Sequence, residues 1–240
     1  MCQDCGCGDV NLVPLEVQTR ILARNDSVAA HNRAHFSERF IFAVNLMGSP
    51  GSGKTAVLEA TARAFKGGRR LAALAGDLAT DNDAQRLEKA GIRSKAITTG
   101  QVCHLDAEMV HHALHHFDST DVEYFFIENV GNLVCPAVYD LGQAVNVVAL
   151  SVTEGEDKPV KYPTMFAKAD LVLLTKVDLM IHLPNVRMSA IEDALARVMP
   201  DPKLISISAQ DGFGVSSWIE WLTERSERMT ALQLAAERTV

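Results

Sequence analysis

The sequence predicts an α/β fold, with a mostly parallel sheet and helices on both faces. Short apolar segments recur along most of the chain, and most are followed by a segment with helical spacing. Most of these segments are apolar throughout, as expected for strands that are covered on both faces. Strands that alternate with helices are typical of parallel sheets. We expect strands at 40–47, 71–76, 93–97, 122–127, 145–152, 171–174 and 204–207.

The helices are expected between and after these strands. Gly91 ends the second helix, and Asp106 caps the third. Pro159 and Pro163 limit the fourth, because proline interrupts helical hydrogen bonding. The expected helices are 54–66, 82–90, 106–116, part of 158–168, 186–198 and 215–237. We predict that residues 38–240 form this one domain, and that residues 1–37 form an N-terminal metal-binding tail and a tether that becomes helical.

Composition is consistent with a soluble protein. The 240 residues are 48% hydrophobic and 22% charged, with a net charge of −7. The negative charge argues against nucleic acid or an anionic membrane as the main partner. No apolar run reaches the roughly 18 residues needed to span a bilayer, and the polar, cysteine-rich start does not look like a signal peptide. We therefore expect a cytoplasmic protein.

The segment 48–55, GSPGSGKT, matches the phosphate-binding pattern G-x-x-x-x-G-K-[ST]. It lies between an expected strand and an expected helix, which is the arrangement that makes this motif specific. Its glycines allow backbone N–H groups to point at an anion at a helix N-terminus. Lys54 is expected to reach the β- and γ-phosphates, and Thr55 to place its hydroxyl on Mg²⁺. The expected nucleotide contacts are Gly48, Ser49, Gly51, Ser52, Gly53, Lys54 and Thr55.

Two carboxylates lie at the ends of predicted strands. Asp77 ends the second strand, and Glu128 follows the fourth. The carboxyl ends of parallel strands form the ligand crevice, so both side chains should face the phosphates and Mg²⁺. Asp77 is the first candidate for the metal's water shell, and Gly131 would offer its N–H to the γ-phosphate. The predicted catalytic residues are Lys54, Thr55, Asp77 and Glu128.

The T-K-V-D segment that begins at Thr175 resembles the N-K-x-D guanine motif. Asp178 would accept hydrogen bonds from N1–H and the exocyclic amine of guanine, donors that adenine does not offer in that arrangement. The stem of Lys176 would lie over the base. Ser208 and Ala209 follow the last strand, where a loop would support the guanine carbonyl. These residues favour GTP and disfavour an ATP-dependent kinase of the same fold.

Cysteines suggest two metal sites. Cys2, Cys5 and Cys7 form C-x-x-C-x-C, and such clusters in a reducing compartment more often bind metal than form disulfides. Thiolates favour soft or borderline divalent ions. If Met1 is removed, the amine of Cys2 becomes a further ligand.

The second predicted site consists of Cys103, His104 and Cys135, on two loops that should emerge at the same sheet edge. Three ligands leave a position open for Asp106, Glu108, water or a second subunit.

The segment 111–116, HHALHH, contains the i,i+4 pairs His111/His115 and His112/His116, a spacing at which side chains meet on a helix. The favoured interpretation is a solvated polar face with weak, adventitious metal affinity. His31 and His35 share this spacing and this interpretation.

Together these motifs resemble the hydrogenase nickel-incorporation GTPase family, HypB, from the N-terminus to about residue 225. The motifs are C-x-x-C-G-C-G at 2–8, the P-loop at 48–55, G-D-x-x-T-x-x-D-A-x-R at 76–86, C-H-L-D at 103–106, E-N-V-G-N-L-V-C-P at 128–136 and T-E-G-E-D-K-P at 153–159. Thr175 departs from the family's usual Asn.

The resemblance implies a P-loop GTPase, regulated by metal, that assists Ni²⁺ delivery to the [NiFe]-hydrogenase large subunit. It implies a nickel chaperone partner, HypA, and a nucleotide-dependent homodimer. By the same resemblance, Cys103, His104 and Cys135 take Zn²⁺ or Ni²⁺, and the three N-terminal cysteines form a high-affinity nickel site. The alternatives are a urease-type nickel-insertion GTPase, or a passive nickel- or zinc-binding protein whose P-loop is vestigial. The Cys-rich tail argues against the first, and the intact Lys54, Thr55, Asp77 and Asp178 argue against the second.

Overall fold

The computed structural model describes residues 15–237, and within them the strands form one seven-stranded sheet in the order β3-β2-β4-β1-β5-β6-β7. Every neighbouring pair in this sheet is parallel. The strands are β1 Phe42–Gly48, β2 Leu71–Asp77, β3 Arg93–Thr98, β4 Tyr124–Glu128, β5 Val145–Ser151, β6 Leu171–Thr175 and β7 Leu204–Ile207. All seven strands were predicted, with bounds that differ by at most two residues, and the predicted α/β architecture is confirmed.

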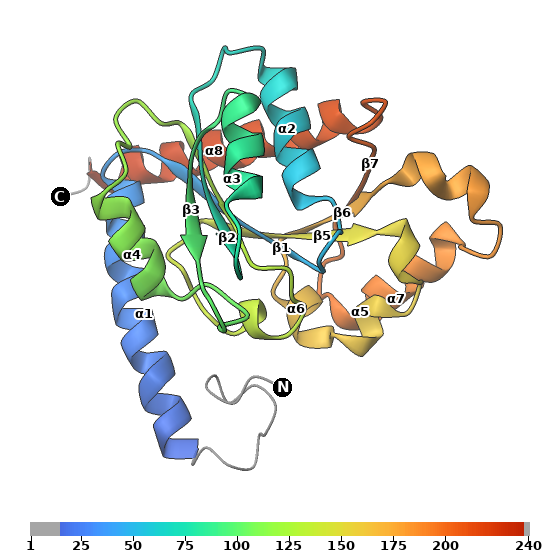
Figure 1. The fold of residues 1–240 in the computed structure, drawn as a ribbon, viewed down its shortest axis with the longest axis horizontal. Helices are drawn as coiled ribbons and strands as arrows, with labels where there is room; N and C mark the ends of the chain where they lie inside the picture. The colour runs from blue at the N-terminus through green and yellow to red at the C-terminus, as the bar shows by residue number, and fades with distance from the viewer. Residues whose placement is uncertain (1–14, 238–240) are drawn as a thin grey trace.

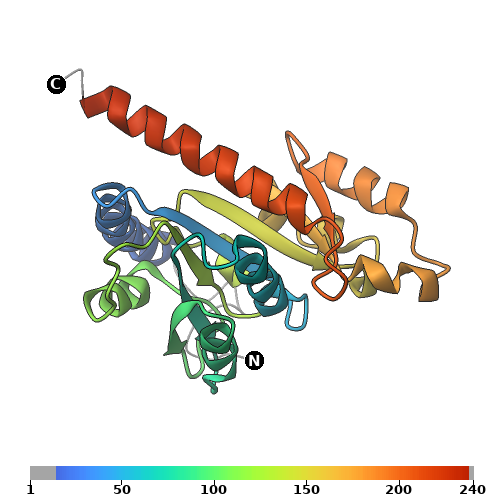
Figure 2. The same ribbon diagram turned by 90° about the horizontal axis from the view of Figure 1, so that it is seen from above.

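The helices cover both faces of the sheet (Figure 1). They are α1 Leu15–Ser37, α2 Lys54–Phe65, α3 Asn82–Lys89, α4 Ala107–His115, α5 Lys158–Lys161, α6 Pro163–Ala167, α7 Met188–Val198 and α8 Val215–Glu237. Helices α2, α3 and α8 pack on one face, while α1 and α4, and α6 and α7, pack on the other. Figure 2 shows α8 as a long helix that runs across the molecule.

Successive side chains along each buried strand point to opposite faces of the sheet, so the strands contribute to a core layer on each face. In β1, Phe42, Val44 and Leu46 belong to the layer under α2, α3 and α8. Ala43 belongs to the layer under α1 and α4, and Met47 to the layer under α6 and α7. Both faces of β1 are therefore covered by helices, which explains why its sequence is apolar and alternates little between apolar and polar residues.

Three short 3₁₀ helices were not predicted. They are η1 Cys135–Ala137, η2 Val152–Glu154 and η3 Val177–His182, and each follows a strand at the same edge of the sheet. Such turns are too short to carry a periodic signal. The segment 158–168 divides into α5 and α6 at Pro163, as the prolines suggested.

Helix α1 packs beside α4, on the α4 side of the sheet (Figures 1 and 2). Asn25 Nδ2 donates to the carbonyl of Asp140, and its Oδ1 accepts from the Ala107 N–H. Gly142 permits this approach, because a Cβ there would lie 2.6 Å from the Ala29 carbonyl. The division at residues 37 and 38 stays a prediction, and the structure adds that the helical part of the expected tether contacts the domain. No helix among the described residues is both long and apolar enough to cross a membrane.

Candidate nucleotide site and metal centre

The P-loop connects β1 to α2, at the carboxyl edge of the sheet. A Cβ at Gly48 would lie 2.4 Å from the Ala149 carbonyl, so only glycine lets β5 and the loop approach this closely. Lys54 Nζ is buried and donates to the carbonyls of Ser49 (3.1 Å) and Gly48 (3.4 Å). Burial lowers the pKa of Lys54, and the nearby Glu128 opposes that shift. The P-loop carbonyls therefore hold the Lys54 side chain in a fixed position.

A cavity of about 410 Å³ opens in front of the loop. Gly51, Gly53, Lys54, Thr55, Asp77, Asp83, Glu128 and Gly131 are among its lining residues. The P-loop, both predicted strand-end carboxylates and Gly131 thus surround one space, as the sequence suggested. Nucleotide phosphates are the ligands that such a cradle suits.

Thr55 lies between two carboxylates. Its Oγ1 is 2.7 Å from Glu128 Oε1 and 2.9 Å from Asp83 Oδ1, yet a hydroxyl has a single proton to donate. Glu128 Oε2 is buried and has no hydrogen-bond partner. Oxygen ligands with an unsatisfied buried carboxylate fit a hard cation such as Mg²⁺.

Asp77 lines the same cavity, but its Oδ1 already accepts from the N–H groups of Ala79 (2.9 Å) and Thr80 (2.8 Å). These backbone hydrogen bonds lower the pKa of Asp77 and keep it ionised. Asp77 is therefore a fixed negative charge that also shapes the turn after β2.

The loop after β4 lies directly on the P-loop. The Asn132 N–H donates to the Gly48 carbonyl (3.1 Å), and a Cβ at Gly131 would lie 2.8 Å from Pro50 Cα. Gly131 therefore stays small so that the two loops touch. Asn129 extends the connection, because its Oδ1 accepts from the Leu105 N–H (3.1 Å) in the loop that carries His104.

Cys103, His104 and Cys135 converge, so that one ligand atom from each lies within 4.8 Å of the others. The two Sγ atoms are 2.9 Å apart as two thiols. His104 Nδ1 is buried without a hydrogen-bond partner, and the ring stacks on Tyr139 with centroids 4.0 Å apart. Burial lowers the pKa of His104 and favours the neutral ring that metals bind.

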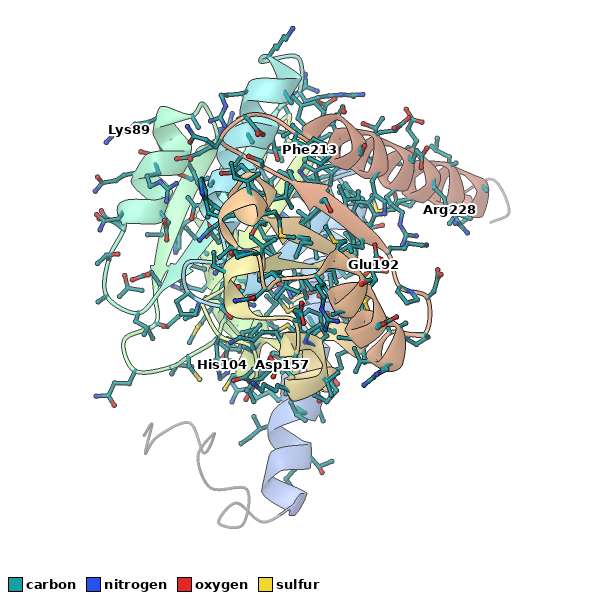
Figure 3. The ribbon with its side chains drawn as sticks, turned by 90° about the vertical axis from the view of Figure 1, so that its right-hand side faces the viewer. Lys89, His104, Asp157, Glu192, Phe213 and Arg228 are labelled. Carbon is teal, nitrogen blue, oxygen red and sulfur yellow. The ribbon has the colours of Figure 1, made fainter. Side chains whose placement is uncertain are left out.

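This donor set fits a borderline ion such as Zn²⁺ or Ni²⁺. In Figure 3, His104 lies toward the bottom of the domain, away from Lys89 of α3 near the top. The two acidic candidates for a fourth ligand have other partners. Asp106 caps α4 by accepting from the Met109 N–H (2.8 Å), and the exposed Glu108 lies 3.6 Å from Arg24.

On the other side of the P-loop, the hydroxyl of Thr175 donates to the Ser52 carbonyl (2.6 Å). The departure from Asn thus keeps a contact between this segment and the P-loop. Lys176 adopts a left-handed conformation (φ 59°), and Asp178 lies in the first turn of η3. Ser208 is buried after β7, and the Ala209 carbonyl accepts from Arg63 of α2 (2.9 Å).

Comparisons with known proteins agree with this geometry. A family model described as CobW/HypB/UreG, nucleotide-binding domain, matches residues 42–205. The hydrogenase maturation factor HypB of Azotobacter vinelandii is 48% identical over 218 residues, which cover 90% of this chain and 72% of that protein. The hydrogenase/urease maturation factor HypB of Helicobacter hepaticus is 47% identical over 221 residues, covering 90% of both.

Solved structures give the same result. HypB from Helicobacter pylori in complex with nickel superposes with a TM-score of 0.81 at 38% identity, covering 85% of this chain and 96% of that one. HypB from Archaeoglobus fulgidus gives a TM-score of 0.79 at 38% identity, covering 85% of this chain and all of that one. The chain belongs to the HypB family.

Within this HypB-family chain, the predicted tail site of Cys2, Cys5 and Cys7 lies outside the described residues. The structure adds residues to which sequence reasoning gave no role. Asp83 contacts Thr55, and its signal was its place in the G-D-x-x-T-x-x-D motif. Glu154 accepts from the Ser49 hydroxyl at the P-loop, and it belongs to the T-E-G-E-D-K-P motif.

Tyr139, which stacks on His104, and Asn129, which contacts the loop that carries His104, also had no assigned role. Asn129 lies within the E-N-V-G-N-L-V-C-P motif. For Tyr139 we find no sequence signal, because its stacking depends on the path of the loop.

The HypB-family site predicts a pH dependence of stability. Burial, opposed by Lys54, raises the pKa of Glu128 to about 7 from a usual value of 4.5. The native state then holds this proton more tightly than the unfolded state, so the free energy of unfolding should fall as pH rises from about 4.5 to 7. Glu128→Gln removes this titration. In the absence of metal and nucleotide, the free energy of unfolding of the wild type should fall by about 2–3 kcal/mol more than that of the variant between pH 5 and pH 8.

Urea denaturation in EDTA at several pH values measures the difference. The exposed Glu192 provides the control, because Glu192→Gln should follow the wild-type curve. Parallel curves for wild type and Glu128→Gln would show that Glu128 does not titrate in this range.

Proposed function

We propose that this chain is a metal-regulated GTPase, which hydrolyses GTP to GDP and phosphate and assists Ni²⁺ insertion into the [NiFe]-hydrogenase large subunit. Membership of the HypB family supports this proposal, as does the arrangement of the P-loop and the strand-end carboxylates. The convergence of Cys103, His104 and Cys135, called the Cys103 group below, supports it as well.

In the proposed reaction, the P-loop N–H groups bind the phosphates, and Lys54 stabilises charge on the β- and γ-oxygens. Thr55, Glu128, Asp83 and Asp77 would hold Mg²⁺, directly or through water. When bound, Mg²⁺ neutralises charge that develops on the phosphate oxygens. Asp178, with Lys176, Ser208 and Ala209, selects guanine. Gly131 contributes its N–H to the γ-phosphate.

The cargo ion is held by Cys103, His104 and Cys135, and a second ion by Cys2, Cys5 and Cys7. Nickel is the cargo, and zinc also suits the Cys103 group. A fourth ligand to the Cys103 group would come from water or from a second subunit of a homodimer. The proposed partners are the nickel chaperone HypA and the hydrogenase large subunit or its maturation complex, in the cytoplasm.

The contacts of the loop after β4 support a coupling between nucleotide binding and metal binding. The loop after β4 touches the P-loop through Gly131 and Asn132, reaches the Leu105 N–H through Asn129, and ends at Cys135. A γ-phosphate that orders this loop would also reposition one of the three metal ligands. By linkage, nucleotide and metal must then change each other's affinity by the same factor.

The test is titration of Ni²⁺ into protein that holds GDP or a non-hydrolysable GTP analogue, with dimerisation followed in parallel. We expect Ni²⁺ affinities that differ by about 5–150-fold between the two states, a coupling of about 1–3 kcal/mol. Cys103→Ala should remove the nucleotide-dependent ion, while the double variant Cys2→Ala/Cys5→Ala should remove only the tail ion. Equal affinities for the Cys103 group in both states would contradict the coupling.

A urease-type client is the alternative, because the Helicobacter hepaticus relative is named for both hydrogenase and urease maturation. Passive metal binding is distinguished by the same samples, since a passive protein would bind Ni²⁺ without releasing phosphate from GTP.

A further inference from the structure

A pair of histidines lies where α4 faces α1, apart from the Cys103 group. His111 and His115 are one turn apart on α4, and their Nε2 atoms are 3.0 Å apart. Their rings are nearly perpendicular, with an interplanar angle of 87°. The two Nε2 atoms therefore face one another.

A buried amide determines which nitrogen of His111 carries the proton. Asn32 Nδ2 donates to the carbonyls of Ala107 (2.9 Å) and Leu141 (3.1 Å). The amide cannot be flipped, because its oxygen would then face two carbonyl oxygens. Asn32 Oδ1 thus points at His111 Nδ1 (3.0 Å) and can only accept, so that Nδ1 is the donor.

It follows that the neutral His111 ring has its lone pair on Nε2, directed at His115. An imidazole whose other N–H is held by an oxygen acceptor is the usual arrangement around a metal-binding histidine. Here Asn32, which is fully buried, supplies that acceptor from α1.

The separation of the nitrogens suits a shared ion. Two nitrogens at about 2.1 Å from a metal are about 3.0 Å apart when they occupy adjacent positions at 90°. Such angles are typical of square-planar and octahedral coordination, which Ni²⁺ and Cu²⁺ adopt with imidazole ligands.

The surroundings leave room for further ligands. A cavity of about 400 Å³ adjoins the pair and is also lined by His35, Arg39 and Asp118. Arg39 is 3.8 Å from Glu38, and Asp118 is 3.6 Å from Arg93, so each of these charges has a partner of opposite sign. Water or a side chain from α1 would complete the coordination.

We propose that His111 and His115 form a bidentate imidazole site for a divalent transition ion such as Ni²⁺, oriented by Asn32. The site is separate from the Cys103 group and does not depend on the proposed GTPase activity. It gives half of the HHALHH segment a specific role where the sequence favoured adventitious binding.

The same helix offers a matched control. His112 and His116 are also four residues apart and exposed, but their ring centroids are 5.1 Å apart at an interplanar angle of 64°. His115 is exposed in the last turn of α4 and His116 is the exposed residue that caps its C-terminus, so alanine at either position should leave the fold intact.

The experiment measures Ni²⁺ bound per full-length chain by equilibrium dialysis and metal analysis, for wild type, His111→Ala, His115→Ala, His112→Ala and His116→Ala. Thermal melts confirm folding. We expect His111→Ala and His115→Ala to lower the affinity for one Ni²⁺ ion by about tenfold or more, while the two control variants keep the wild-type affinity for it. In a Cys103→Ala background the same ion should remain, with histidine scattering in its X-ray absorption spectrum.

Equal Ni²⁺ binding by the two pairs of variants, whether retained or lost together, would overturn the proposal. Retention would leave the His111–His115 contact as a hydrogen bond only, and joint loss would indicate a nonspecific histidine surface. GTP hydrolysis in the same samples tests the proposed function separately, because neither histidine lines the nucleotide cavity.

Discussion

Lys54→Ala should reduce GTP turnover at least about a hundredfold to a thousandfold. The Lys54 ammonium is buried against the P-loop carbonyls, where its charge does not have to reorganise when the phosphoryl group moves. Removing it also removes the cation that opposes the high pKa of Glu128, so that Glu128 should become harder to ionise. Single-turnover release of phosphate from GTP and Mg²⁺ measures the loss.

The control is Lys89→Ala, at the exposed end of α3 (Figure 3). It changes the net charge equally without touching the cavity and should retain wild-type turnover. A Lys54→Ala protein that hydrolyses GTP at the wild-type rate would remove the P-loop from the mechanism.

The second large effect is expected at the base. Asp178→Asn should weaken GTP binding by about 10²-fold or more and favour xanthosine triphosphate, because the amide swaps the pattern of donor and acceptor that the purine meets. The hydrogen bond from Thr175 to the Ser52 carbonyl should survive, which leaves the phosphate site in place. Competition binding with the guanine, xanthine and adenine nucleotides measures the change.

Asp193→Asn, on an exposed position of α7, provides the matched control and should leave specificity unchanged. A wild-type protein that hydrolyses ATP as efficiently as GTP would contradict the assignment of Asp178 to guanine.

Local patterns carried much of the fold. Most strand segments are apolar because both faces of the sheet are covered, and that signal does not depend on which strands are neighbours. The exception is the edge strand β3, RSKAIT, which is only partly buried. The P-loop was also readable, because its spacing reflects a local requirement for small residues at Gly48 and a cation at Lys54. The convergence of Cys103, His104 and Cys135 followed from one topological rule, that the carboxyl ends of parallel strands share an edge.

Other features depended on which segments meet. Asp83 and Glu128 reach the same hydroxyl of Thr55 because β2, β4 and β1 are adjacent in the sheet, an order that strand composition alone does not give. The side-chain amide of Asn129 connects the loop after β4 to the loop that carries His104. Its partner there, the Leu105 N–H, is 24 residues away in sequence.

The histidines are the clearest case. In the sequence, His111/His115 and His112/His116 are equivalent pairs with the same spacing on the same helix. Only the packing of α1 on α4 places Asn32 against one of them, and the two carbonyls that hold its amide then set the tautomer of His111. Spacing along a helix determines which side chains can meet, whereas the state of a ring nitrogen depends on a hydrogen-bond partner that the tertiary fold brings from another element.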